Sequence, residues 1–300
     1  MARFRIPAQS VCTRLKMHRN WLWAALLILA GCSGFKPPAL PQAKLDADSY
    51  LNFAQQLETA GDLSGALHDY ESAYQQYRGI GDREGQLASR SGIGRIALAK
   101  NDRPGYEAEL KNMEQQAALH GEYLDCYPLL LRVHKHLIEK EYRLVSQLAV
   151  AKPNYPWEEK MQLMIAKLQA DSYLGQATSA KAAELARLSK QHYKLLKKRK
   201  SANTELVSSA SYALAYYHFS SGNPGKAQGL AEKAADWDYR FGDFKAYAHS
   251  LWLMAQIATA KNDATNANSY YDRAIGIFEN LKDKAALEAI MQERSLPKGE

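Results

Sequence analysis

Cysteine is scarce in this 300-residue sequence, and its placement leaves little room for disulfide bonds. Two of the three cysteines, Cys12 and Cys32, fall near the amino terminus, and Cys126 lies far from both. Because Cys12 and Cys32 belong to the amino-terminal segment described below, Cys126 has no partner for an intramolecular bond. We therefore expect Cys126 to be a small buried hydrophobic residue, with a free reactive thiol as the alternative.

The sequence also lacks the motifs of common catalytic sites. It has no glycine-rich phosphate loop, no Gly-x-Ser-x-Gly elbow and no His-Glu-x-x-His pair. His134 and His136 are two residues apart, so on a helix they point in different directions and cannot share a metal ion. We expect structural or solvated roles for the other histidines. The sequence therefore predicts no catalytic residue, no metal site, no cofactor and no enzyme activity.

The formal net charge of +7 is basic, but much of it lies at the amino terminus. Five basic residues precede Cys32, and no acidic residue accompanies them. Without those five, 34 of the 39 Lys and Arg residues remain against 32 Asp and Glu residues, a net charge of +2. Nucleic-acid binders usually concentrate basic residues on one face. We therefore expect no nucleic-acid partner.

The apolar run at residues 21–30 is too short to cross a membrane. It has ten residues, whereas a membrane-spanning helix needs about 20. Basic residues precede this run, and Leu29-Ala30-Gly31-Cys32 ends it with small residues just before the cysteine. The arrangement resembles the signal peptide and lipobox of bacterial lipoproteins. The resemblance implies that residues 1–31 are a signal peptide and that Cys32 carries a covalent lipid such as palmitate.

The resemblance to lipoproteins also implies a location. Ser33 follows Cys32, and in proteobacterial lipoproteins the absence of aspartate at this position favours the outer membrane over the inner one. The protein would then face the periplasm from a lipid anchor, which is stable when several acyl chains are present. Met17 is an alternative start, because it gives a shorter and more typical signal. We expect residues 32–45, which contain three prolines, to form an extended tether.

From residue 46 onward, a short turn pattern recurs between helical segments. Gly61-Asp62 and Asn101-Asp102 are 40 residues apart, and so are Gly222-Asn223 and Asn262-Asp263. A turn of this kind at a fixed period indicates a solenoid of helix-turn-helix units. Apolar residues recur at helical spacing on both sides of the first turn, at Tyr50, Phe53, Ala54 and Leu57 and then at Ala66, Tyr70 and Ala73.

The small and aromatic residues around these turns resemble the tetratricopeptide repeat. The last unit carries them at Leu251, Met254, Ala255, Ala258, Ala267, Tyr271 and Ala274. Two central units are weaker, with Pro153 and Pro156 between them; the second is aligned on Ala170, Tyr173, Ala182 and Ala186. The resemblance implies an all-α fold, an α-solenoid of about six tetratricopeptide-like repeats. It would cover residues 46–294 with a capping helix from Lys284, followed by a tail at 295–300.

Tetratricopeptide arrays usually bind partners on the concave surface formed by the first helix of each pair, so the resemblance implies a groove. Counting from each turn places a polar and basic set in the amino-terminal half, at Asn52, Gln55, Arg95, Arg132 and Lys135. The carboxy-terminal half would present an aromatic ledge with Tyr212, Tyr216, Trp252 and Gln256. Arginine and aromatic residues often dominate binding energy. The alternative is that the three aromatic residues pack between repeats.

The basic run Lys194–Lys200 is the one charge cluster of note in the repeat region. Cations at the carboxy-terminal end of a helix complement its dipole, so a solvated helix end is the simplest interpretation. Contact with anionic headgroups, lipopolysaccharide or an acidic partner is the alternative.

These features together favour a membrane-anchored scaffold or adaptor in the bacterial cell envelope, which binds an envelope protein or peptide in the groove. The alternative is a binding module for a small peptide or glycan at the aromatic ledge. We expect a monomer or a weak dimer, because a capping helix covers one end of the array. The other end, near Leu45, depends on the tether or a partner for cover.

Overall fold

The computed structural model of the chain describes residues 40–198 and 203–295. The predicted signal peptide, Cys32 and most of the predicted tether lie outside these residues, as do the last two residues of the basic run. From Gln42 onward the described residues belong to one compact unit. None of the described helices is both long enough and apolar enough to cross a lipid bilayer.

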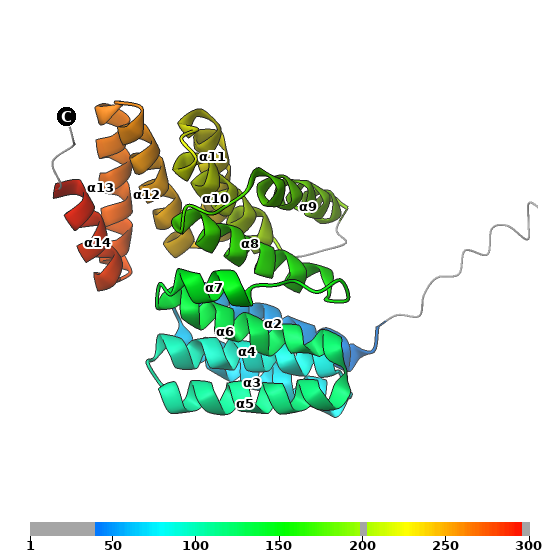
Figure 1. Cartoon of the computed structure of the whole chain (residues 1–300). Coiled ribbons are helices and arrows are strands. Elements are labelled where there is room, and N and C mark those ends of the chain that lie inside the picture. The colour runs from blue at the N-terminus through cyan, green and yellow to red at the C-terminus, as the bar shows by residue number, and fades with distance from the viewer. Residues whose placement is uncertain (1–39, 199–202, 296–300) are drawn as a thin grey trace, which may run out of the picture. The chain divides into compact units, whose positions relative to one another are not determined.

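The described part of this unit is entirely helical, which confirms the predicted all-α class. Consecutive helices pack against each other along the chain, as in an α-solenoid (Figure 1). The described elements are α2 (Gln42–Ala60), α3 (Leu63–Gly79), α4 (Arg83–Ala99), α5 (Arg103–His120), the 3-10 helix η1 (Glu122–Asp125), α6 (Cys126–Ile138), α7 (Tyr142–Leu148), α8 (Trp157–Tyr173), α9 (Ser179–Lys197), α10 (Glu205–Ser220), α11 (Pro224–Phe241), α12 (Phe244–Ala260), α13 (Ala264–Asn280) and α14 (Lys284–Ser295).

The recurring two-residue turn pattern has a local physical cause. Gly61 adopts a positive φ of 85°, and Asn101 takes the same left-handed region at 57°. In the next position, the Asp62 backbone N–H donates to the Leu57 carbonyl at 2.9 Å, which closes the end of α2. The Asp62 side chain then accepts a hydrogen bond from the Gly65 backbone N–H at 3.0 Å and caps the start of α3. One residue pair thus ends one helix and begins the next.

The repeat core consists of small residues and tyrosines. Ala66, Tyr70 and Ala73 are buried on α3, as the spacing predicts, and so are Ala267, Tyr271 and Ala274 on α13. Cys126 is also fully buried, which confirms the prediction of a buried hydrophobic residue. The ring of Tyr70 lies directly on Gly92 of α4, where an added Cβ atom would come within 2.4 Å of the ring. A glycine at this position therefore lets α3 and α4 approach closely.

The predicted apolar stripe on α2 is confirmed at Ala54 and Leu57, which pack in the core, but is wrong at Tyr50 and Phe53. Tyr50 and Phe53 are 38% and 56% exposed, and the buried positions are Ala47 and Ala54. Two hydrogen bonds explain this rotation of the helix. The Tyr77 hydroxyl donates to Asp48 Oδ1 at 2.7 Å, and the Tyr70 hydroxyl donates to Glu58 Oε2 at 2.6 Å. Asp48 and Glu58 must therefore face α3, which turns Tyr50 and Phe53 outward.

The element boundaries differ from the predicted ones at several places. Helix α2 begins at Gln42, so the last residues of the expected tether at 32–45 are helical, and α14 ends at Ser295. The third unit is shortened, because α7 covers only Tyr142–Leu148 before the loop that contains Pro153 and Pro156. In the fourth unit Ala170 and Ala182 are buried as expected, but Tyr173 and Ala186 are exposed.

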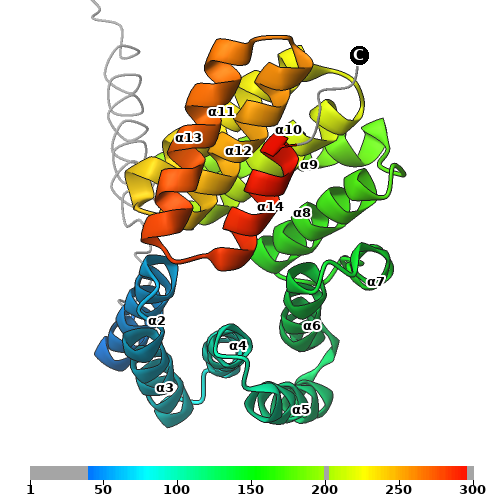
Figure 2. The same ribbon diagram turned by 90° about the vertical axis from the view of Figure 1, so that its left-hand side faces the viewer.

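Alternate helices line the inside of the array. Helices α2, α4, α6, α8, α10 and α12 each contact the next one in this series, and α12 also contacts α2. The six helices therefore form a closed ring rather than an open groove. Figure 2 shows α2, α4, α6 and α8 in succession around a common centre, with α3 and α5 outside them. We call the sides of α2, α4, α6, α8, α10 and α12 that face one another the inner face.

Candidate binding surface on the inner helices

Arg95 lies on the inner face but is fully engaged by neighbouring side chains. Its guanidinium donates to Glu58 Oε1 at 2.9 Å and to Glu58 Oε2 at 2.7 Å, and also to the Tyr70 hydroxyl at 2.8 Å. Burial favours the neutral form of Glu58, but the charge of Arg95 outweighs it and keeps the pKa of Glu58 below its ordinary value. Arg95 therefore joins α2, α3 and α4, and most of its donors are already used.

Two other groups face the same centre, and the sequence analysis did not select them. His134 of α6 is half-buried, and burial together with the charge of Arg95 lowers its pKa to about 4. Glu205 of α10 retains solvent contact, but the surrounding protein raises the pKa of its carboxyl despite the attraction of Arg95. Helices α4 and α10 are not neighbours in the series, but Arg95 and Glu205 still interact electrostatically. We call Glu58, Arg95, His134 and Glu205 the charged cluster.

The other polar and basic residues predicted for the groove are exposed or pair with residues outside this cluster. Arg132 is paired with Glu114, and the Lys135 ammonium contacts Glu139 at 2.7 Å. Asn52 and Gln55 are exposed on α2. The structure therefore does not bring the five predicted residues into one site. Of the five, only Arg95 belongs to the charged cluster.

Tyrosines gather where α7, α8 and α10 meet. The rings of Tyr142 and Tyr173 are parallel within 3° at a centroid distance of 4.2 Å, and Tyr173 stacks on Tyr216 at 4.3 Å. We call these three residues the tyrosine stack. Tyr173 is 41% exposed, although it is the middle ring. Burial and the neighbouring Tyr216 raise the pKa of Tyr173 to about 12, so its hydroxyl stays protonated at neutral pH and interacts with the hydroxyls of Tyr142 and Tyr216.

Tyr212 extends this aromatic region by one helical turn along α10. It is half-buried, and burial followed by the proximity of Tyr173 and Tyr216 raises its pKa well above the ordinary value. Repeat counting predicts Tyr212 and Tyr216 as binding residues, but not Tyr142 or Tyr173. Tyr142 begins a second helix, and the alignment assigned Tyr173 to a core position. The repeat pattern therefore held no signal for either residue.

Trp252 and Gln256 are engaged by the closing helix α14. The Trp252 indole N–H donates to Glu293 Oε2 at 3.1 Å, and the Gln256 amide donates to the same oxygen at 2.7 Å. The Tyr271 hydroxyl donates to the other Glu293 oxygen at 2.7 Å. These contacts attach the cap to the array, and the charge of Glu293 also acts on Tyr173 and Tyr216 of the tyrosine stack.

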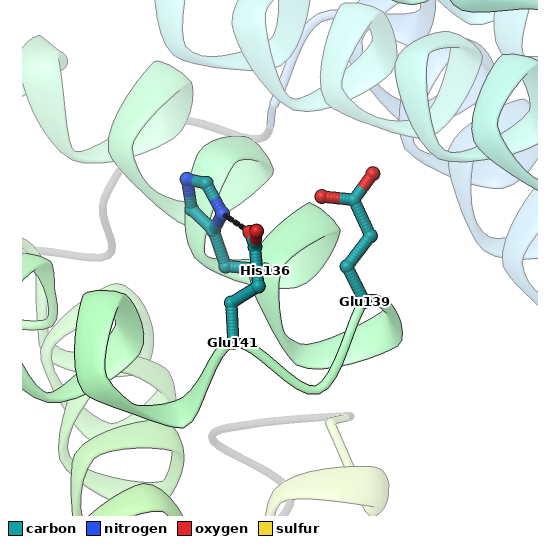
Figure 3. Close-up of side chains that lie close together, drawn as sticks. All are labelled: His136, Glu139 and Glu141. Carbon is teal, nitrogen blue, oxygen red and sulfur yellow. Dashed lines mark hydrogen bonds and ion pairs between the residues drawn. The ribbon is translucent and has the colours of Figure 1, made fainter.

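A cluster of possible metal ligands lies at the turn between α6 and α7 (Figure 3). His136, Glu139 and Glu141 offer ligand atoms within 4.8 Å of one another, and His136 Nδ1 lies 2.5 Å from Glu141 Oε2. Glu139, however, already contacts Lys135 at 2.7 Å and Arg103 at 3.4 Å. The hydrogen bond from Lys135 holds the pKa of Glu139 below its ordinary value. Two cations thus neutralise the carboxylate that a metal ion would need.

One polar pocket of about 230 Å³ lies between the ends of α4 and α5, beside Arg83, Gln86 and His120. It contains none of the residues predicted for the groove, and no side chain of the charged cluster or the tyrosine stack lines it. The tyrosine stack, by contrast, combines solvent exposure with a pre-formed shape, as a binding surface requires.

No family model matches the chain, and no curated protein is significantly similar to it.

Proposed function

We propose that the protein is a lipid-anchored scaffold of the bacterial cell envelope, which holds a partner polypeptide against the tyrosine stack. Consecutive helix packing and the repeated turn chemistry support an array of about six tetratricopeptide-like repeats. The lipobox at Cys32 supports lipidation, a signal peptide at 1–31 and attachment to the outer membrane. A protein of this kind needs a rigid surface that contacts its partner.

The exposed tyrosine stack is the observation that carries this proposal. Three rings from three helices are held in fixed orientation, and the middle ring is 41% exposed. Aromatic rings that are already ordered lose little entropy on binding and contribute large contact areas. The charged cluster is less suited to this role, because the N–H groups of Arg95 already donate hydrogen bonds to Glu58 and Tyr70. An extended peptide with an apolar anchor would fit the tyrosine stack.

Crosslinking and recovery from solubilised envelopes tests the scaffold function. The wild-type chain should recover a partner in stoichiometric amount, and Tyr173→Ala should reduce its recovery at least tenfold, as expected for a central aromatic contact. Tyr123→Ala is the matched control, because Tyr123 is exposed to a similar degree, 37%, but lies in η1. Recovery of no partner, or an equal loss in both variants, would count against the proposal.

The second candidate is a binding module for a small peptide or a glycan at the same tyrosines. The observation that favours it is the stack itself, because aromatic faces and protonated hydroxyls contact sugar rings well. Native mass spectrometry of the purified chain separates the two functions. A bound small molecule that disappears in Tyr173→Ala would support the ligand module. A wild-type mass without a non-covalently bound small molecule, together with a crosslinked protein partner, would support the scaffold.

A further inference from the structure

Helices α9 and α11, in the upper part of Figure 1, carry a second group of aromatic residues. The Tyr193 ring meets the Trp237 ring edge-on at 6.0 Å, and Trp237 stacks on Phe241 at 5.2 Å. Phe241 is 54% exposed, and Phe244 just beyond it is 47% exposed. These rings therefore form an ordered but uncovered aromatic edge at the corner between α11 and α12.

Lysines surround this edge. The ammonium groups of Lys197 and Lys233 lie over the Tyr193 ring at 4.7 Å and 5.6 Å from its centroid. Lys190 and Lys194 are also exposed on α9, and they share the face of Tyr193 and Lys197 by helical spacing. We call Tyr193, Trp237, Phe241, Lys190, Lys194, Lys197 and Lys233 the basic–aromatic surface.

The charge of this surface is not cancelled within the described part of the chain. None of its four lysines takes part in an ion pair with a described residue. On α11 the charge of Asp236 is compensated by Arg240 at 2.8 Å, whereas Glu232 accepts only from the neutral Gln228 amide at 2.8 Å and remains a single negative charge beside the four lysines. The lysines thus present a net positive charge around exposed aromatic rings.

We propose that the basic–aromatic surface docks on a membrane surface that contains anionic lipid. Aromatic side chains favour the interface between headgroups and acyl chains, and lysines extend their charges to the phosphates. Phe241 and Phe244 are both exposed at the corner between α11 and α12, where a broad surface can reach them together with the lysines. Cation–aromatic contacts already hold Tyr193 in place, so docking orders few additional groups. This proposal does not depend on the tyrosine stack or on the partner that it holds.

Lysine footprinting of the full chain in vesicles tests this docking. The chain is incorporated at equal amounts into phosphatidylcholine vesicles with and without phosphatidylglycerol, and an amine-reactive reagent is applied. We expect Lys194, Lys197 and Lys233 to react about tenfold more slowly in the anionic vesicles, with full reactivity restored by high salt. Lys111 on α5 is exposed and should react equally in both. If each of the four lysines reacts at the same rate in both kinds of vesicle, the proposal is overturned.

Charge removal separates lipid docking from the other possible occupants. The triple change of Lys190, Lys194 and Lys197 to Gln keeps helix-forming residues and should abolish the slower labelling of Lys233 in anionic vesicles, since each lysine contributes a factor of about five to docking. Changing Lys100, Lys111 and Lys284 to Gln is the control and should have little effect. Slower labelling of the same lysines with soluble polyglutamate but not with anionic vesicles would instead indicate an acidic polypeptide and overturn lipid docking.

Discussion

The charged cluster and the tyrosine stack differ in how much of their binding capacity the protein itself consumes. In the charged cluster, Arg95 donates to Glu58 at two oxygens and to Tyr70. In the tyrosine stack, the rings order one another, but Tyr173 remains 41% exposed. Arginine and tyrosine are both frequent at binding sites, so residue type alone does not distinguish the two regions. The difference shows that contacts within the protein decide which of the two regions can still bind a partner.

Arg95→Ala should have the largest effect on stability. The change leaves the Glu58 carboxylate without its cation and removes a bond among three helices. We expect the free energy of unfolding to fall by about 2 kcal/mol, after allowance for the partial exposure of the pair. Urea denaturation followed by circular dichroism measures it. If Arg95→Ala is as stable as wild type, Arg95 is available to bind a partner, and the charged cluster does not differ from the tyrosine stack in this respect.

Acid should weaken the charged cluster before it affects the tyrosine stack. The pKa of His134 is lowered to about 4 by burial and by Arg95 and Lys245, with Glu58 opposing. Between pH 6.5 and pH 4 the unfolded chain takes up this proton and the folded chain does not, so stability falls as pH falls through this window. We expect His134 to account for about 1–2 kcal/mol of that loss, allowing for its partial exposure.

Urea denaturation at pH 7 and pH 4.5 measures the contribution of His134. His134→Gln should show a smaller loss of stability on acidification than wild type. Some loss will remain in the variant, because the pKa of His249 is also lowered to about 4 by burial and by Lys245. A Tyr216→Ala variant should keep the full wild-type pH dependence. An identical loss in His134→Gln and wild type would show that His134 does not titrate as the cluster requires.

Lys135→Ala should have the smallest effect. Lys135 was predicted for the groove along with Arg95, but its ion pair with Glu139 spans one turn of an exposed helix end. Pairs of this kind contribute little to stability, because solvent screens them. We therefore expect nearly unchanged stability and unchanged partner recovery. A clear loss of partner with Lys135→Ala would extend the binding surface to the outer turn of α6 and would weaken the distinction drawn here.

The sequence allowed prediction of those features that depend on neighbouring residues along the chain. The turn at Gly61-Asp62 is local chemistry, because a left-handed residue and a capping carboxylate act within a few positions. The burial of Tyr70 and Tyr271 follows from helical spacing. The α2 rotation was not predictable in this way, because it depends on Asp48 and Glu58 meeting tyrosines of another helix.

The candidate site was less predictable, because it depends on contacts between distant segments. Tyr142 and Tyr173 come from adjacent but irregular units, and only the shortened α7 brings their rings together. Glu293 occupies Trp252 and Gln256 from a helix about 40 residues later in the chain. Repeat counting places residues on a face, but it cannot show which of them another side chain has already engaged.

The most direct test measures stability and partner recovery together in Tyr173→Ala and Arg95→Ala. We predict that Tyr173→Ala reduces recovery at least tenfold while its free energy of unfolding falls by only about 1 kcal/mol, since its ring is partly exposed. Arg95→Ala should unfold more easily but retain its partner under conditions where it remains folded. Loss of the partner in Arg95→Ala, with full recovery in Tyr173→Ala, would contradict the account.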